Sequence, residues 1–202
     1  MSVADLIQPI HIRAFSEQTS AKYKSVVLSP TVKEDVQRAA DFLNAMGIVN
    51  TTAHLKSYAF TLGTVIWYPF DVVNPAPLGG WTLAWQIITI AHEHVHVEDA
   101  LEVGVDKFAK DYVLSSEARA TRWEAKAYCV TAELAPVLWD GWHPDPSEIV
   151  APLRAYGCTD ADIRGAAEVV RLRQAAIKAG GVLSGQARFA IEFLRKARLY
   201  TP

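Results

Sequence analysis

A histidine, a glutamate and a second histidine stand at the spacing HExxH, as His92, Glu93 and His96. Imidazoles four positions apart on an α-helix lie about one turn from each other on one face, so both can reach the same metal ion. Zinc is the metal that this pair predicts. Glu93, next to the first ligand, is then placed to take a proton from a water molecule that zinc makes more acidic. The motif therefore predicts a hydrolytic zinc centre.

The same pattern has a second interpretation, a solvated or hydrogen-bonded histidine cluster that matches by chance. Residues 81–91, which precede the motif, are almost entirely apolar and place it in a buried helix. Charged and polar groups there need partners, and a cation supplies one. This context favours the metal. His94 points toward the back of the helix and is expected to be structural, as are His11 and His54.

A catalytic zinc site needs a third protein ligand and one open position. No histidine follows at the spacing of an HExxHxxGxxH site, which leaves Glu117 and Glu124 on the next long helix. These lie about 10.5 Å apart along a helix axis, so only one can bind the ion. The motif helix rises about 12 Å from His96 to Gly104, and an antiparallel partner starting near Ser115 descends as far by about residue 123. This favours Glu124, and Glu117 is interpreted as a charge at a helix N-terminus.

Two segments carry a resemblance to a known group: His92-Glu93-His94-Val95-His96 and, 28 positions after His96, Glu124-Ala125-Lys126-Ala127-Tyr128. Over residues 58–135 the chain resembles the gluzincins, zinc metallopeptidases whose third ligand is a Glu on a helix behind the HExxH helix. It is also similar to small zincin-like proteins of bacteria and tailed phages. The resemblance implies that His92, His96 and Glu124 bind zinc and that Glu93 is the general base. The chain departs from the family's ExxxD pattern, because Tyr128 stands where an Asp is expected.

The mechanism that the resemblance implies is hydrolysis of an amide bond, in which Glu93 activates water and then passes the proton to the leaving amine. The strand around Gly63–Tyr68 would pair through its edge with an extended peptide substrate, although it can equally be core sheet.

Two further roles are open. An oxyanion donor is needed, and His143 in a Trp-rich loop is favoured slightly over the tyrosines at 112, 128 and 156. Asp99 either orients a ligand imidazole or lies at the surface.

Periodicity, caps and breakers predict the elements that position these residues. The expected fold class is α+β, predominantly α-helical and zincin-like, with a small antiparallel sheet or hairpin ahead of the HExxH helix. The chain is expected to be a single domain, 1–202, with its metal-site core at 58–135 and a C-terminal helical part at 147–202. Ahead of the motif, the predicted elements are a helix over 31–46 stopped by Gly47, a strand or hairpin over 57–70 turning near Gly63, and a loop over 75–80. The motif helix is predicted over 81–103, ending at Gly104, and is followed by a short helix over 106–113 and a long helix from Ser115 or Ser116 to about Leu138. A loop over 139–146 and helices over 147–156, 159–179 and 184–199 complete the prediction.

Composition restricts the function classes. Half of the 202 residues are apolar and a fifth are charged, which predicts a globular chain with a sizeable core. A net charge of −2 favours neither nucleic acid nor a membrane surface as a partner. The longest apolar run is too short to span a bilayer. No secretory signal is visible, and Cys129 and Cys158 lack metal or redox spacing, so we expect a cytoplasmic protein, or a virion protein if a phage encodes it.

The leading hypothesis is a zinc-dependent peptide or amide hydrolase that acts on a peptide or protein substrate. The alternative, from a different class, is a structural or assembly protein, such as a phage particle component, that keeps a zincin fold and a metal site with little or no turnover and has an assembly partner. A third interpretation is a zinc-dependent regulator whose peptidase acts on one intracellular partner.

Overall fold

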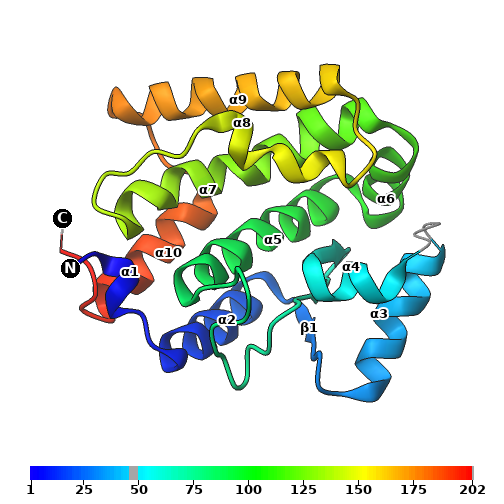
Figure 1. Ribbon diagram of the computed structural model, residues 1–202, viewed down its shortest axis with the longest axis horizontal. Helices are drawn as coiled ribbons and strands as arrows, with labels where there is room; N and C mark the ends of the chain where they lie inside the picture. Colours follow the sequence, from blue (N-terminus) through cyan, green and yellow to red (C-terminus); the bar gives the residue numbers. More distant parts are fainter. Residues whose placement is uncertain (46–49, 202) are drawn as a thin grey trace. The chain divides into compact units, whose positions relative to one another are not determined.

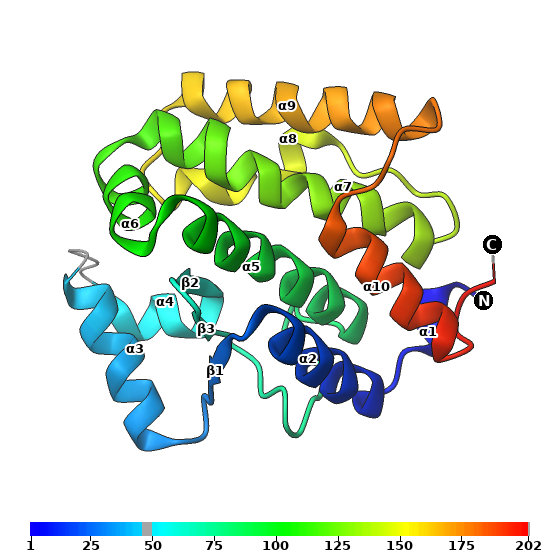
Figure 2. The same ribbon diagram turned by 180° about the vertical axis from the view of Figure 1, so that it is seen from behind.

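The computed structural model describes residues 1–45 and 50–201 (Figures 1 and 2). The chain divides into two compact units: the first comprises Met1–Ile7 and Asp106–Pro202, and the second comprises Gln8–Val105. The described residues are predominantly helical and contain one three-stranded mixed sheet, which confirms the predicted class at this level. Among them, no helix combines the length and the apolar character needed to cross a bilayer.

The second unit is built around helix α5, Leu83–Val103, which is buried over most of its circumference. The helix begins after Thr82, whose hydroxyl accepts a hydrogen bond from the backbone N–H of Trp85. It ends at Gly104, where φ is 91° and a side chain would be strained. These bounds confirm the predicted motif helix to within two residues. Helix α2, Pro9–Tyr23, lies alongside α5 (Figure 2).

The remaining helices of this unit are α3, Lys33–Ala45, and α4, Thr51–Ser57. Helix α3 confirms the helix predicted over 31–46, and its predicted stop at Gly47 lies outside the described residues. Both helices contribute to a small apolar core. Its buried members are Leu28, Ala39, Leu43, Leu55 and Trp67.

The sheet has the strand order β1-β3-β2, with β1 at Val26–Leu28, β2 at Phe60–Leu62 and β3 at Val65–Trp67. Strand β3 pairs antiparallel with β2 and parallel with β1. The predicted hairpin and its turn are confirmed, because Gly63 has a φ of 60° between β2 and β3. The prediction that the strand around 63–68 offers its edge to a substrate is wrong, since β3 is paired on both sides.

Side chains alternate between the two faces of the sheet, and this decides what faces the motif helix. Phe60 in β2 stacks on Trp67 in β3, with 6.5 Å between the ring centroids. Thr61 points to the opposite face, where its hydroxyl contacts α5 at Glu93. Strand β2 thus holds the small core on one side and reaches the HExxH motif on the other.

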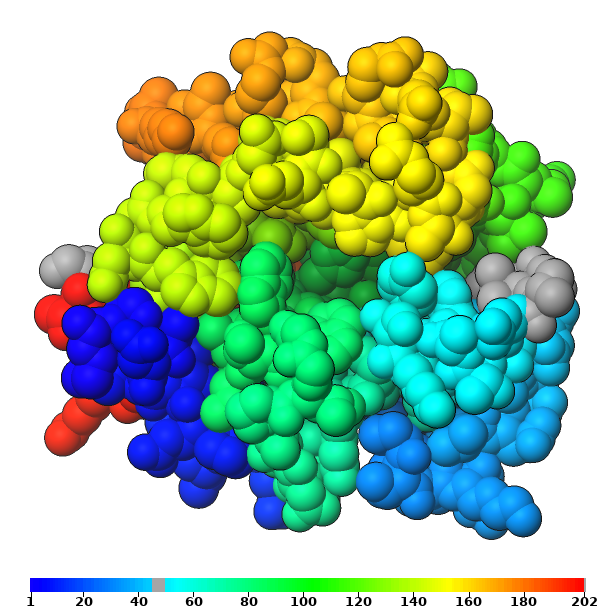
Figure 3. Space-filling model, in the orientation of Figure 1, coloured from blue at the N-terminus to red at the C-terminus, as the bar shows by residue number. Residues whose placement is uncertain are grey.

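The first unit contains the helices α1, Val3–Leu6; α6, Val105–Leu114; α7, Ala125–Leu138; α8, Pro146–Ile149; α9, Asp160–Lys178; and α10, Gly185–Lys196. Helix α7 packs against α9 and α10. Helix α9 also packs against α8, and Figure 3 shows their side chains together on one face of the unit. The caps at Thr159 and Ser184 confirm the predicted starts of α9 and α10.

Two segments of the first unit differ from the predicted helices. The long helix expected from Ser115 to Leu138 starts with a π-helix, η1, at Ala118–Glu124, before it continues as α7. The helix expected over 147–156 is instead α8 followed by a short 3₁₀ helix, η2, at Ala151–Arg154. Pro152 explains the second difference, because it has no backbone N–H to continue α8.

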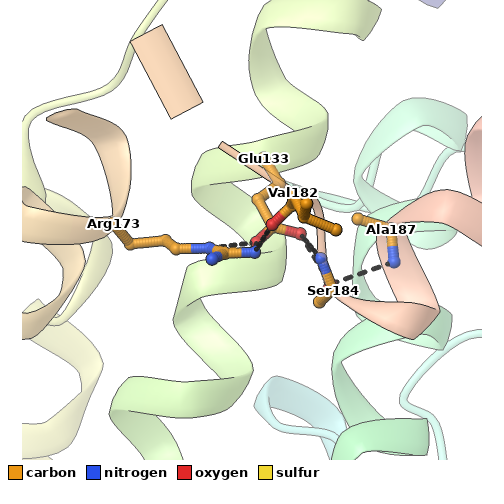
Figure 4. Close-up of polar contacts among 5 residues, drawn as sticks. All are labelled: Glu133, Arg173, Val182, Ser184 and Ala187. Atoms are coloured by element: carbon orange, nitrogen blue, oxygen red, sulfur yellow. Dashed lines mark hydrogen bonds and ion pairs between the residues drawn. The ribbon is translucent and has the colours of Figure 1, made fainter. Parts of the chain in front are cut away.

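A buried ion pair joins three helices of the first unit (Figure 4). Glu133 on α7 has a fully buried side chain, and one of its oxygens accepts hydrogen bonds from the guanidinium of Arg173 on α9. The other oxygen accepts from the backbone N–H and the hydroxyl of Ser184, at 2.9 and 2.6 Å. Ser184 in turn caps α10 by accepting from the N–H of Ala187. Both carboxylate oxygens of Glu133 have structural partners, so we interpret this cluster as a clamp between helices.

Candidate functional site

The two histidines of the motif lie one turn apart on α5, as the spacing predicts. Their ring centroids are 5.2 Å apart, and the ring planes meet at 79°. His92 is partly exposed, whereas His96 is only 4% exposed. One imidazole is therefore accessible from outside while the other is embedded, an arrangement that suits an ion held at the edge of a core.

Glu93 lies between the two histidines in sequence and is 4% exposed. The hydroxyl of Thr61, on β2, donates a hydrogen bond to Oε2 of Glu93 at 2.8 Å and lies 3.3 Å from its carbonyl oxygen. A carboxylate that is buried in this way is oriented by its donor and cannot rotate freely. Strand β2 therefore fixes the group predicted to be the general base.

His94 faces the other side of α5 and is fully buried. Its Nδ1 lies 2.7 Å from the carbonyl oxygen of Ile90, and its Nε2 lies 2.9 Å from the hydroxyl of Ser25. Burial lowers the pKa of His94 to about 4, although the hydrogen bond to Ile90 acts in the opposite direction. A ring that is neutral at pH 7 and bonded at both nitrogens holds α5 to the chain ahead of β1, in agreement with the structural role predicted for it.

Asp99 and Tyr68 are two further buried polar residues of the second unit. Asp99, on α5, is 2% exposed, so the interpretation of this residue as a surface charge is wrong. Tyr68, just after β3, is fully buried, and its pKa is raised well above the usual value by burial and, to a lesser extent, by the negative charge of Glu93. The phenol therefore stays protonated beside the motif.

Glu124 is the last residue of the π-helix in the first unit, and it is 4% exposed. The hydroxyl of Tyr112, on α6, donates a hydrogen bond to its Oε1. Glu117, the other carboxylate considered as a ligand, is exposed one residue before the π-helix. Of the two carboxylates, Glu124 has the burial and the fixed orientation expected of a ligand.

The sequence made Tyr112 one candidate oxyanion donor, but in the structure its hydroxyl donates to Glu124. A phenol has a single proton to donate, and that proton is used on Glu124.

His143 follows the C-terminal end of α7, whereas Glu124 immediately precedes its first residue. A helix of 14 residues is about 21 Å long, so the two side chains start from opposite ends of the same rigid element. Burial, and then the positive charge of Lys178, lower the pKa of His143. The structure thus separates His143 from Glu124, and the catalytic role predicted for His143 keeps no support from geometry.

The structure adds two hydroxyl donors that the sequence did not single out for these contacts, Thr61 on Glu93 and Tyr112 on Glu124. Thr61 gave no signal beyond its place in an alternating strand. Tyr112 stands 12 positions before Glu124 on a separate helix, and no local spacing rule links the two.

No protein-family model, no curated protein and no solved structure matches this chain.

Proposed function

We propose that this protein is a zinc-dependent hydrolase of peptide or amide bonds with a zincin-like fold of the gluzincin type. The observation that carries the proposal is the environment of the HExxH motif. Glu93 is almost fully buried, and Thr61 fixes the orientation of its carboxylate. On the same helix, the rings of His92 and His96 lie one turn apart with 5.2 Å between their centroids. A chance motif on a surface helix would not need this support.

His92, His96 and Glu124 are the proposed zinc ligands. Two imidazole nitrogens and a carboxylate oxygen form a donor set that zinc takes in catalytic sites. The side chains fit that role, because His96 and Glu124 are each 4% exposed and a buried carboxylate is stabilised by a cation. Three protein ligands leave one position open for water or substrate.

When bound, zinc would act as a Lewis acid on the scissile carbonyl and on water. Glu93 then accepts a proton from the attacking water, whose oxygen bonds to the carbonyl carbon. As the carbon–nitrogen bond breaks, Glu93 returns this proton to the leaving amine. Thr61 keeps the carboxylate in one orientation through both transfers. We leave His143 out of this scheme because α7 lies between it and Glu124.

The substrate is proposed to be an extended peptide that pairs with strand β2. Strand β3 is paired on both sides, whereas β2 pairs only with β3 among the strands of the described residues. Thr61 connects this outer strand to Glu93, so a peptide added at β2 would run close to the proton acceptor. A strand of three residues offers few backbone hydrogen bonds, and specificity would therefore depend on side-chain contacts.

Metal analysis and peptide cleavage test the proposal together. We expect about one zinc per chain in the wild type, with most of it lost in His92→Ala and in Glu124→Ala. The matched controls His54→Ala and Glu117→Ala should keep it. Glu93→Gln should retain zinc and lose cleavage of a broad peptide library, whereas Glu98→Gln, an exposed position on the same helix, should keep cleavage.

Each negative outcome has a distinct meaning. A wild-type protein that binds no zinc, even when zinc is added, would rule out the metal centre. Bound zinc without cleavage of any peptide would favour the alternative, an assembly protein that keeps the metal site without turnover. Cleavage that survives Glu93→Gln would remove the mechanism.

A further inference from the structure

Tyr112 and Glu124 come from different helices of the first unit and meet through one hydrogen bond. The phenol donates to Oε1 of the carboxylate. We infer that Tyr112 is a positioning residue for zinc, which orders the carboxylate of Glu124 before the ion arrives. This inference rests on the proposed function, because it takes Glu124 as a ligand.

Tyr112 is itself held at its backbone and at its ring. Arg119 donates hydrogen bonds to the carbonyl oxygens of Tyr112 and Val113, at 2.7 and 3.0 Å, and a further one to that of Tyr156. The guanidinium carbon of Arg119 lies 5.5 Å from the centroid of the Tyr112 ring, and the ring of Phe108 is 5.7 Å from it. A phenol fixed in this way can impose its orientation on a partner.

The π-helix contains both the anchor and the ligand. Arg119 lies near the start of η1 and Glu124 is its last residue, so one segment holds Tyr112 in place and presents the carboxylate to it. The π-helix thus contacts Tyr112 on α6 through Arg119, and the hydroxyl of Tyr112 in turn donates to Glu124 at the end of the same π-helix.

The physical benefit is a ligand that does not have to be ordered on binding. A glutamate side chain has three rotatable bonds, and fixing them when zinc binds would cost conformational entropy. A buried carboxylate that binds metal through one oxygen also needs a donor for the other. Groups that orient a ligand in this manner typically change metal affinity by 10- to 100-fold.

The test is the zinc dissociation constant, measured by competition with a chromophoric chelator. Tyr112→Phe removes the donor but keeps the ring against Phe108 and Arg119, and we expect roughly 10- to 100-fold weaker zinc binding. Tyr200→Phe, a matched change in the same unit, should bind as the wild type does. In a Glu124→Ala background, Tyr112→Phe should change the constant by less than about twofold, because its effect passes through Glu124.

The outcomes separate this inference from the proposed function. Wild-type protein that binds no zinc overturns the metal centre, and the role of Tyr112 with it. Wild-type zinc binding together with unchanged affinity in Tyr112→Phe overturns the role of Tyr112 alone. The same follows if Tyr112→Phe weakens zinc binding as much in the Glu124→Ala background as in the wild type.

If Tyr112→Phe does not fold without metal, it is folded with zinc, and its rate of zinc release into excess chelator is compared with that of the wild type. Faster release supports the inference, and an equal rate overturns it.

Discussion

At the scale of single residues, the two carboxylates of the proposed site are each oriented by a hydroxyl from another element. Thr61 on β2 donates to Glu93 on α5, and Tyr112 on α6 donates to Glu124 at the end of the π-helix. Both carboxylates are 4% exposed. A buried carboxylate without donors would be costly, so each hydroxyl stabilises the fold as well as the geometry of the proposed site.

The first prediction concerns Thr61. Thr61→Val keeps the shape of the side chain and removes the donor to Glu93, which should lower the free energy of unfolding by about 1–3 kcal/mol. Zinc affinity should stay unchanged, since Glu93 is a proton acceptor and not a ligand, while peptide cleavage should slow. Urea unfolding in the presence of a chelator measures the first effect, and chelator competition measures the second.

Thr61→Ser serves as the control, because it restores the hydroxyl. It should recover most of the cleavage rate that Thr61→Val loses. Equal stability and equal cleavage in the wild type and in Thr61→Val would show that the hydrogen bond to Glu93 contributes nothing.

At the scale of elements, the positions of helices α7, α9 and α10 depend on polar side chains as well as on apolar packing. Glu133 links α7 to α9 through Arg173 and to the start of α10 through Ser184. Breaking a buried pair on one side leaves an uncompensated charge, and this is more destabilising than losing a surface pair.

Glu133→Gln should therefore lower the free energy of unfolding by about 3 kcal/mol, because the guanidinium of Arg173 loses its anion. Thermal or urea unfolding, followed by circular dichroism, measures the change. Glu168→Gln breaks the exposed pair with Arg171 one turn away on α9 and should have little effect. A similar small effect in both variants would contradict the clamp.

At the scale of the whole molecule, a metal bound only by the folded chain must stabilise it. If zinc binds His92, His96 and Glu124, free zinc at 100 times its dissociation constant should add about 2.7 kcal/mol to the free energy of unfolding. We expect the unfolding midpoint to rise with zinc and to fall when EDTA removes it.

The double variant His92→Ala/His96→Ala should show no response to zinc or to EDTA. His54→Ala should respond as the wild type does, because His54 lies outside the proposed ligand set. Equal midpoints with zinc and with EDTA in the wild type would contradict a metal that is bound only in the folded state.

Most elements were predictable where a local rule applied. The motif helix, the hairpin at Gly63 and the caps at Thr159 and Ser184 follow from apolar periodicity and from residues with strong positional preferences. Helix α2 gave no such signal, because its buried positions include the polar residues Ser16 and Thr19. The π-helix was also missed, because its wider turn gives no sequence signal that distinguishes it from an α-helix.

The sequence by itself determined that His92, Glu93 and His96 share one helix, because the apolar residues around the motif and the glycine at its end predict that helix. Only the tertiary structure decided which groups orient these side chains. Thr61 is 32 positions from Glu93, and Tyr112 reaches Glu124 from a separate helix. Contacts of this kind depend on where distant elements pack, and local periodicity carries no information about that.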